Sequence, residues 1–143
     1  MKMRVVTATS KGKLLTVAEQ IAKIGESSYA VDSIPPAYPM ERERLVVIVA
    51  TLNTNMPSSF SIFCKDMSKD RTANVALVVD GTAEKAKDAV AIVREAVASA
   101  GAHFCEDILY IQGGLPFKFF KKTTPAEDEA VKAWTEKLLS SLA

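Results

Sequence analysis

The stretch MRVVTATSKGKLLTVAEQIAKI, residues 3–24, decides the fold of this chain. It begins with β-branched residues typical of a short strand, breaks at a loop of small residues over 8–12, and continues as a helix. The helix is predicted because apolar side chains recur on one face, at Leu14, Val17, Ala18, Ile21 and Ala22. Amides at the start of such a helix have no partner within it. Together with the helix dipole they predict an anion site at the loop.

Two lysines, Lys11 and Lys13, lie at the positive end of this predicted helix dipole. A cation is unfavourable there unless a negative group is close, and a bound phosphate would supply that group. The alternative is that both lysines are simply solvated, at a cost of about a few tenths of a kcal/mol. The spacing alone leaves both interpretations open.

Size and charge narrow the class of protein. A length of 143 residues predicts a single domain with a sizeable core, and a net charge of +1 gives no field that would attract nucleic acid. No apolar run is long enough for a signal peptide or a membrane span. Cys64 and Cys105 are far apart and match no metal-ligand spacing. We therefore expect a cytoplasmic protein with free thiols and no metal site.

The rest of the chain alternates between strand and helix signals. Strands are predicted over 29–31, 45–50, 74–79 and 103–111, and helices over 57–67, 84–100 and from 125 onward. For the helix over 84–100, Thr82 is a natural N-cap. In the last helix, Thr124, Pro125 and Glu127 form a capping-box start. The strand over 103–111, the fifth, is predicted to be an edge strand, in which Glu106 and Asp107 are solvated charges.

Boundaries and packing are also predicted from single residues. Gly25 and Gly101 are expected to end helices. Cys64 recurs at helical spacing with three large apolar residues, Phe60, Phe63 and Met67, so it is interpreted as a packing residue. The inner face of the last helix is predicted to carry Ala130, Val131, Trp134 and Leu138.

This alternation predicts an α/β fold: a parallel sheet of five strands in the order 2-1-3-4-5, with helices on both faces in three layers. Ligands of such sheets bind outside the carboxyl ends of the strands, where the strand order reverses. That point lies between the first and third strands. Loops 8–13 and 51–56 are therefore expected to face one crevice, with 80–82 beside them.

At this point the sequence resembles the flavodoxin family. Residues 5–22 resemble that family's first strand, phosphate loop and first helix, without a gap. Residues 45–57 resemble its third strand and the loop beside the isoalloxazine ring, and 75–82 its fourth strand and second flavin loop. The resemblance covers essentially the whole chain, in the short form of the family. It implies a single flavodoxin-like domain over 1–143.

A weaker resemblance concerns the C-terminal part. In flavodoxin-domain oxidoreductases, including the protoporphyrinogen-oxidising kind, a glycine after the last strand precedes an aromatic and basic stretch and then a helix with a tryptophan. Here the matching residues are Gly113, Gly114, 117–122 and Trp134. The stretch 117–122 fits a partner-docking surface or ordinary core packing with solvated lysines.

The resemblance implies FMN as cofactor. Thr9 and Gly12 match the phosphate loop, where Thr9 would donate its hydroxyl to phosphate and Gly12 would allow close backbone approach. Three positions depart from the family, because Lys11, Lys13 and Leu14 replace the usual hydroxyl residue, Asn and Thr. A lysine can still hold phosphate as a point charge.

The flavin-flanking loops depart from the family as well. They contain none of the aromatic residues that often sandwich the ring, although Leu52 and Met56 could pack against one face. The backbone amides of both loops would contact the edge of the ring. The complete set expected to bind FMN is Thr9, Ser10, Lys11, Gly12, Lys13, Leu14, Thr51, Leu52, Asn53, Thr54, Asn55, Asp80, Gly81 and Thr82.

No constellation of catalytic side chains stands out. His103 is the only histidine and is interpreted as an edge-strand residue. Asp80 is not read as a receiver-domain phosphoacceptor, because residues 7–13 contain no acidic cluster. Two hypotheses remain: an FMN protein that transfers electrons with a redox partner protein or serves a flavin-dependent oxidoreductase system, and a non-enzymatic accessory module with a degenerate flavin site.

Overall fold

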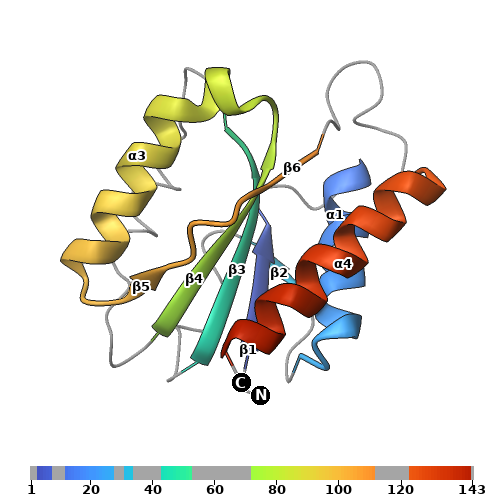
Figure 1. The fold of residues 1–143 in the computed structure, drawn as a ribbon, viewed down its shortest axis with the longest axis horizontal. Coiled ribbons are helices and arrows are strands. Elements are labelled where there is room, and N and C mark those ends of the chain that lie inside the picture. The colour runs from blue at the N-terminus through green and yellow to red at the C-terminus, as the bar shows by residue number, and fades with distance from the viewer. Residues whose placement is uncertain are drawn as a thin grey trace.

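The computed structural model describes residues 3–7, 12–27, 31–33, 43–52, 72–111 and 123–142. The elements, in chain order, are β1 (Met3–Thr7), α1 (Gly12–Ile24), β2 (Asp32–Ser33), β3 (Glu43–Thr51), β4 (Thr72–Asp80), α3 (Ala83–Ser99), β5 (His103–Phe104), β6 (Leu109–Ile111) and α4 (Pro125–Leu142). Figure 1 shows the sheet between α3 on one side and α1 with α4 on the other. These are the three layers that the alternation of strand and helix signals predicts.

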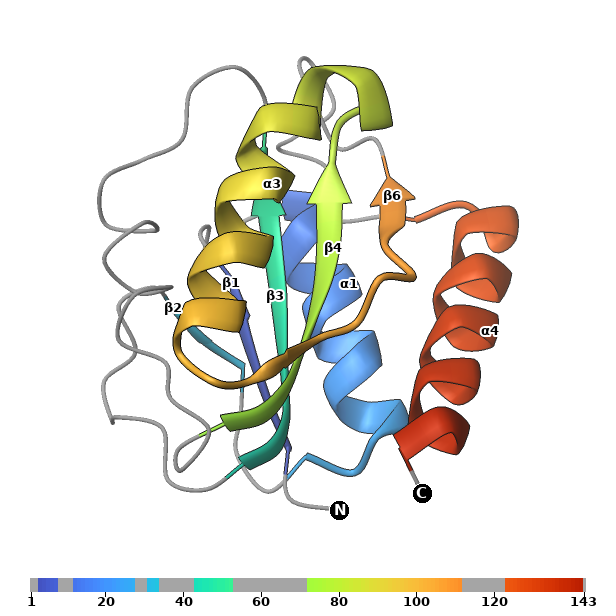
Figure 2. The same ribbon diagram turned by 60° about the vertical axis from the view of Figure 1, so that its left-hand side comes forward.

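The sheet has the predicted topology. Its order is β2-β1-β3-β4-β5, β6 also pairs with β4, and every pairing is parallel. The longest ladder joins β3 to β4, from Glu43 opposite Thr72 to Thr51 opposite Asp80. In Figure 2 the arrowheads of β3, β4 and β6 point to the same edge, which we call the carboxyl edge. The predicted order 2-1-3-4-5 is confirmed.

The apolar run at the centre of β3 explains the two cores. Residues 45–50 are all buried, as a parallel strand covered on both faces requires. Successive side chains point to opposite faces, so Val46, Ile48 and Ala50 join the core beneath α3. Leu45, Val47 and Val49 join the core beneath α1 and α4. Alternate side chains of β3 therefore supply apolar surface to the helices on both faces of the sheet.

Two strand predictions need correction. For the second strand, predicted over 29–31, residues 29 and 30 lie outside the described residues and Val31 is not in a strand; the described strand is the two-residue β2, Asp32–Ser33, which pairs with the last two residues of β1. The fifth strand, predicted as continuous over 103–111, is split into β5 and β6, which share one position beside β4. Within the break, the carbonyl of Asp107 accepts a hydrogen bond from Trp134 Nε1 at 2.9 Å, so this carbonyl has a partner in α4.

The charges in this break contact both helix layers. Glu106 pairs with Arg94 of α3 at 3.0 Å, and Asp107 pairs with Lys137 of α4 at 3.4 Å. All four side chains are exposed, so each pair contributes little stability. The predicted edge charges are therefore surface groups, and they also mark where the strand is interrupted.

Helix α1 ends where predicted, but by a different residue. The Ser27 amide donates to the Ala22 carbonyl and the Glu26 amide to the Lys23 carbonyl, which is a Schellman motif with Glu26 at the left-handed position, φ 51°. Gly25 precedes that position. Its role is close packing, because a Cβ there would overlap Met3 Sδ and lie 2.9 Å from Met3 Cε.

Helix α3 uses the predicted residue for the same motif. Gly101, with φ 85°, donates its amide to the Ala98 carbonyl, and the Ala102 amide donates to the Val97 carbonyl. Its predicted N-cap is also present, since the Thr82 hydroxyl accepts a hydrogen bond from the Lys85 amide at 3.2 Å. Both ends of α3 are therefore fixed by residues that the sequence identifies.

Helix α4 begins with the predicted capping box. The Thr124 amide donates to Glu127 Oε1 at 2.9 Å, and the Glu127 amide donates to Thr124 Oγ1 at 3.2 Å. Its buried residues are Val131, Trp134, Thr135 and Leu138, so Thr135 replaces the predicted Ala130, which is exposed. Thr135 is tolerated in the core because its hydroxyl donates to the Val131 carbonyl at 2.7 Å.

Several predictions lie outside the described residues: the helix over 57–67 with Phe60, Phe63, Cys64 and Met67, the glycine pair Gly113–Gly114, and the stretch 115–122. Within the part of the chain that is described, no helix combines the length and the apolar character that a membrane crossing needs.

Candidate functional site

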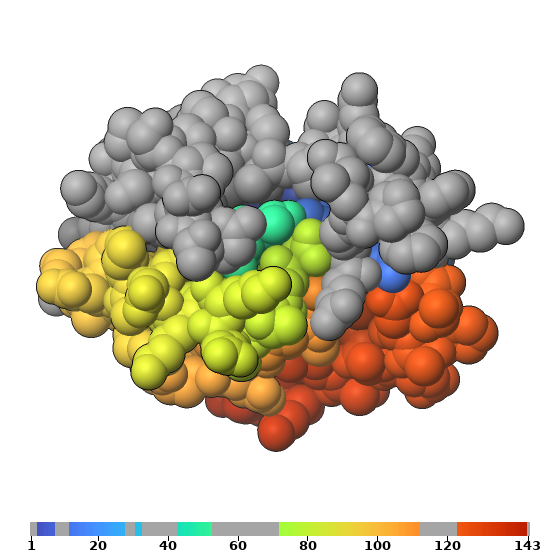
Figure 3. Space-filling view, turned by 90° about the horizontal axis from the view of Figure 1, so that it is seen from above, coloured from blue at the N-terminus to red at the C-terminus, as the bar shows by residue number. Residues whose placement is uncertain are grey.

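The carboxyl edge of the sheet brings together the beginnings of two helices and the ends of two central strands. Figure 3 looks onto this edge, and the coloured surface at its centre comes from the ends of β3 and β4 beside the start of α1. The start of α1 also lies beside the start of α4, as the contacts below show. Of the residues expected to bind FMN, Thr9, Ser10, Lys11, Asn53, Thr54 and Asn55 lie outside the described residues.

Gly12 opens α1 and has a left-handed backbone, φ 76°. An L-residue adopts that conformation only with strain, whereas glycine does so freely. The turn leads directly into the first helical amides, which have no carbonyl partner within the helix. Such helix-start amides are groups that an anion can bind, so the start of α1 offers donors that could hold a phosphate group.

Lys13 follows Gly12, and its side chain lies against α4. Lys13 Nζ donates to both carboxylate oxygens of Glu127, at 2.7 Å and 3.0 Å. The two side chains are 12% and 24% exposed, so this is a partly buried pair. Partial burial alone would raise the pKa of Glu127. The hydrogen bond from Lys13, the bond from the Thr124 amide and the Lys13 charge outweigh it and lower that pKa.

Thr51 and Asp80 link the ends of β3 and β4. They are opposite each other in the ladder, and the Thr51 hydroxyl donates to Asp80 Oδ2 at 2.8 Å. Asp80 is buried although it is an acid, which the hydrogen bond to a neighbouring strand compensates. The bond joins the two strand ends from which the expected flavin loops continue.

Gly81 allows the same two loops to approach. Its φ is +144°, and a Cβ there would lie 3.1 Å from the Leu52 carbonyl oxygen. Its amide donates to the Ile111 carbonyl at 2.9 Å, so this donor is used within the protein rather than directed at a ligand. Thr82 is exposed, and its hydroxyl accepts the Lys85 amide as the N-cap of α3.

Two apolar members of the expected set have buried side chains. Leu14 is 6% exposed in the core beneath α1, as its helical spacing predicts. Leu52 is fully buried in the core beneath α3, so its side chain packs inward instead of lying at the carboxyl edge. For these two residues only the backbone is placed to contact a ligand.

Sequence reasoning missed two residues that take part in this site. Glu127 was recognised as a capping-box residue, but nothing in the sequence places it beside Lys13, 114 positions earlier. Ile111 supplies the carbonyl that holds the Gly81 amide, which depends on the pairing of β6 with β4. The capping box gave a partial signal for Glu127, because it fixes a carboxylate at the start of a helix.

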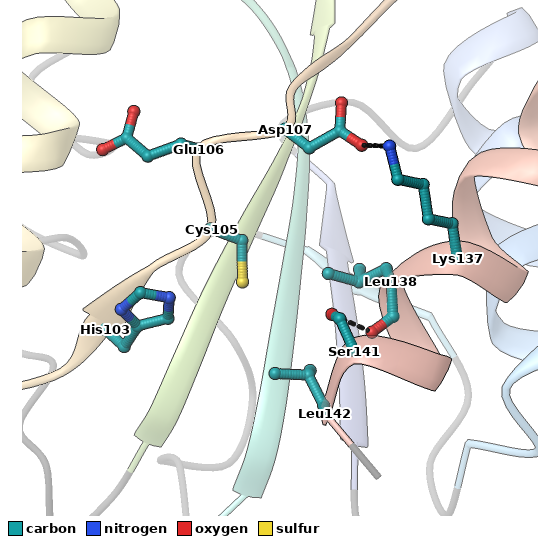
Figure 4. A pocket seen from close by; sticks show the side chains of 8 residues that line it. All are labelled: His103, Cys105, Glu106, Asp107, Lys137, Leu138, Ser141 and Leu142. Atoms are coloured by element: carbon teal, nitrogen blue, oxygen red, sulfur yellow. Dashed lines mark hydrogen bonds and ion pairs between the residues drawn. The ribbon is translucent and has the colours of Figure 1, made fainter.

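A cavity of about 310 Å³ lies elsewhere in the molecule, between the β5–β6 connection and the C-terminal half of α4. Figure 4 shows the Cys105 thiol pointing into it. Its lining residues are His103, Cys105, Glu106, Asp107, Lys137, Leu138, Ser141 and Leu142. Burial, and then the Glu106 charge, raise the pKa of Cys105, so the thiolate is disfavoured and the thiol is a poor nucleophile. His103 is exposed on the short edge strand, as predicted.

Within the described ranges, no three His, Cys, Asp or Glu side chains are placed to hold one metal ion.

Comparison with known proteins identifies the fold. No protein-family model matches the sequence, and no curated protein matches it. Solved structures do match: Flavodoxin 1 of Bacillus cereus has a TM-score of 0.69 at 16% identity, with all of both chains covered. The flavodoxin of Streptococcus pneumoniae TIGR4 has a TM-score of 0.69 at 13% identity, with 99% of both chains covered.

A further match is the WrbA-like flavodoxin of Agrobacterium tumefaciens, with a TM-score of 0.62 at 10% identity, covering 99% of this chain and 96% of that one. Strand order, helix placement and these matches define a doubly wound α/β protein. Its particular fold is that of the flavodoxins.

Proposed function

We propose that this chain is a flavodoxin-like redox protein that binds FMN at the carboxyl edge and transfers electrons, either to a partner protein or within a flavin-dependent oxidoreductase system. The observation that carries the proposal is the left-handed Gly12 at the start of α1, at the point where the sheet order reverses. The flavodoxin fold supports it, because open α/β sheets bind ligands at that point.

Each part of the edge has a separate task in this proposal. The amides at the start of α1 would bind the phosphate. The strand ends joined by Thr51 and Asp80 would hold the flavin-flanking loops at a fixed spacing. FMN itself would supply the redox chemistry, which accounts for a site without catalytic acids and bases.

The first test is binding of FMN and of riboflavin, which lacks the phosphate. We expect added FMN to lose fluorescence in a saturable titration with purified protein. Riboflavin should bind at least tenfold more weakly if the helix start holds the phosphate, since tenfold corresponds to about 1.4 kcal/mol. Equal affinities for FMN and riboflavin would mean that the protein does not contact the phosphate of FMN. No binding of FMN in excess would overturn the proposal.

A second function has support from specific contacts. The Gly81 amide, the Thr51 and Thr82 hydroxyls and the Lys13 ammonium all have partners inside the protein. A flavin site whose polar groups are satisfied internally is what a non-enzymatic accessory module with a degenerate site would have. A protein that ignores excess FMN but retains a cooperative unfolding transition would favour this alternative.

A further inference from the structure

The pair formed by Lys13 and Glu127 joins two helix starts that the sequence separates by most of the chain. Lys13 is the second residue of α1, and Glu127 lies in the first turn of α4. Figure 1 shows both helices on one face of the sheet, each starting at the same edge. The carboxylate of Glu127 therefore lies at the helix start where the proposed phosphate site is located.

The two partners of this pair are in unequal electrostatic surroundings. Glu127 is favoured at its position, because the α4 dipole and the Thr124 amide both stabilise a negative charge there. Lys13 is disfavoured by the α1 dipole, and a negative group must compensate it. In this structure Glu127 provides that negative group. A ligand phosphate at the start of α1 would provide the same compensation.

We propose that Glu127 is an internal competitor of the ligand's phosphate for the Lys13 ammonium, so that the Lys13–Glu127 pair lowers the affinity of the site for phosphorylated ligands. The inference rests on the proposed function for the location of the site, and it adds an autoinhibitory contact to that site. Binding of a phosphate would draw Lys13 away from Glu127, or would have to proceed without the lysine.

The geometry permits this exchange. Both side chains keep some solvent contact, so neither charge is left in a dry interior when the pair separates. Glu127 also retains the Thr124 amide as a donor after Lys13 leaves, which holds the capping box together. A lysine side chain rotates about four single bonds and carries a mobile point charge, as a transferable contact requires.

The test compares Glu127→Gln with a matched control, Asp128→Asn. Both variants remove one negative charge from the first turn of α4, but Glu127 is bonded to Lys13 whereas Asp128 is bonded to Gln20 and Thr123. Glutamine retains an oxygen that can accept the Thr124 amide, so the helix start is preserved. We expect Glu127→Gln to tighten FMN binding about three- to tenfold, and Asp128→Asn to change it by less than about twofold.

The same titrations in a Lys13→Gln background identify the mechanism. If Glu127 acts by occupying Lys13, the double variant Lys13→Gln/Glu127→Gln should bind FMN no more tightly than Lys13→Gln alone. A gain that persists without Lys13 would mean general charge repulsion and would overturn the inference. Equal affinities of the Glu127→Gln and Asp128→Asn proteins would overturn it as well.

Inorganic phosphate separates this inference from the proposed function. It is titrated into each variant while the Gly12 amide is followed by NMR. Tighter phosphate binding by Glu127→Gln than by Asp128→Asn, in proteins that ignore FMN, would support the competitor and overturn the flavin proposal. FMN binding that is unaffected by either substitution would support the flavin proposal and overturn the competitor. Trp134 emission checks that α4 remains docked, because this tryptophan is 6% exposed in the core.

Discussion

Polar pairs at the two edges of the sheet differ in their exposure to solvent. At the amino end, Arg4 of β1 and Glu43 of β3 form an ion pair at 3.0 Å whose side chains are 2% and 0% exposed. At the carboxyl end, Lys13 and Glu127 are partly exposed, and Thr51 at the end of β3 is exposed although its partner Asp80 is buried. Buried charges must be matched permanently, whereas partly solvated ones can change partners. The amino-end pair is therefore suited to stabilising the fold, and the charges of the carboxyl-end pair can change partners.

The largest effect is expected at the amino end. Arg4→Met should lower the free energy of unfolding by about 3–5 kcal/mol, because it leaves the Glu43 carboxylate buried without its ion-pair partner. Urea denaturation measures the change. FMN binding by the folded fraction should be unaltered, since the pair lies away from the carboxyl edge.

The control for this prediction is the double variant Arg4→Met/Glu43→Met. Because no charge remains to be desolvated, it should recover much of the lost stability. If Arg4→Met costs less than about 1 kcal/mol, the amino-end pair is not the structural contact that this comparison requires.

A second amino-end change tests packing instead of charge. Gly25→Ala should cost about 1–3 kcal/mol, because the added methyl group overlaps the fully buried Met3 side chain and forces it to move. The neighbouring Glu26→Gly is the matched control. It should be neutral or stabilising by up to about 1 kcal/mol, because glycine relieves the left-handed strain at φ 51°. Thermal unfolding of both proteins distinguishes the two; equal destabilisation would refute the packing role.

At the carboxyl end, Thr51→Val should cost about 1–2 kcal/mol, because the Asp80 carboxylate loses a hydroxyl donor. It should also weaken FMN binding, since the strand ends lose the bond that fixes their spacing. Thr51→Ser keeps the hydroxyl and serves as the control. The comparison is sharpened if Thr51→Val changes flavin affinity while Arg4→Met does not, and it fails if the two change flavin affinity equally.

The smallest effect is a pH dependence. The pKa of Glu127 is lower in the folded chain than its ordinary value of 4.5. Its contribution to stability is therefore fully present above about pH 4.5 and is lost as the pH falls through the folded pKa. Unfolding free energies of the wild type and Glu127→Gln should differ at pH 7 and converge toward pH 3. A constant difference across that range would show that the charge of Glu127 does not stabilise the fold.

Much of the architecture follows from local patterns. The apolar runs of β3 and β4 predict central strands because a doubly covered strand must be apolar on both faces. The α4 capping box and the Gly101 stop depend only on residues within a few positions of each other, so short-range chemistry determines them. The split of the last strand was not predicted; the Asp107 carbonyl inside the break is bonded to Trp134, 27 positions away, which no local pattern indicates.

For the site, the sequence by itself determined the strand over 3–7 and the helix that starts at Gly12, with the helix amides that this start leaves unpaired within the helix. Backbone preference and hydrophobic periodicity are local properties, so one stretch suffices to predict them. Only the tertiary structure decided that Lys13 lies against Glu127, that Asp80 is bound by Thr51, and that Leu52 is buried. These contacts form when distant segments pack together, and the free energy of a charge depends on the groups that folding brings within a few ångströms.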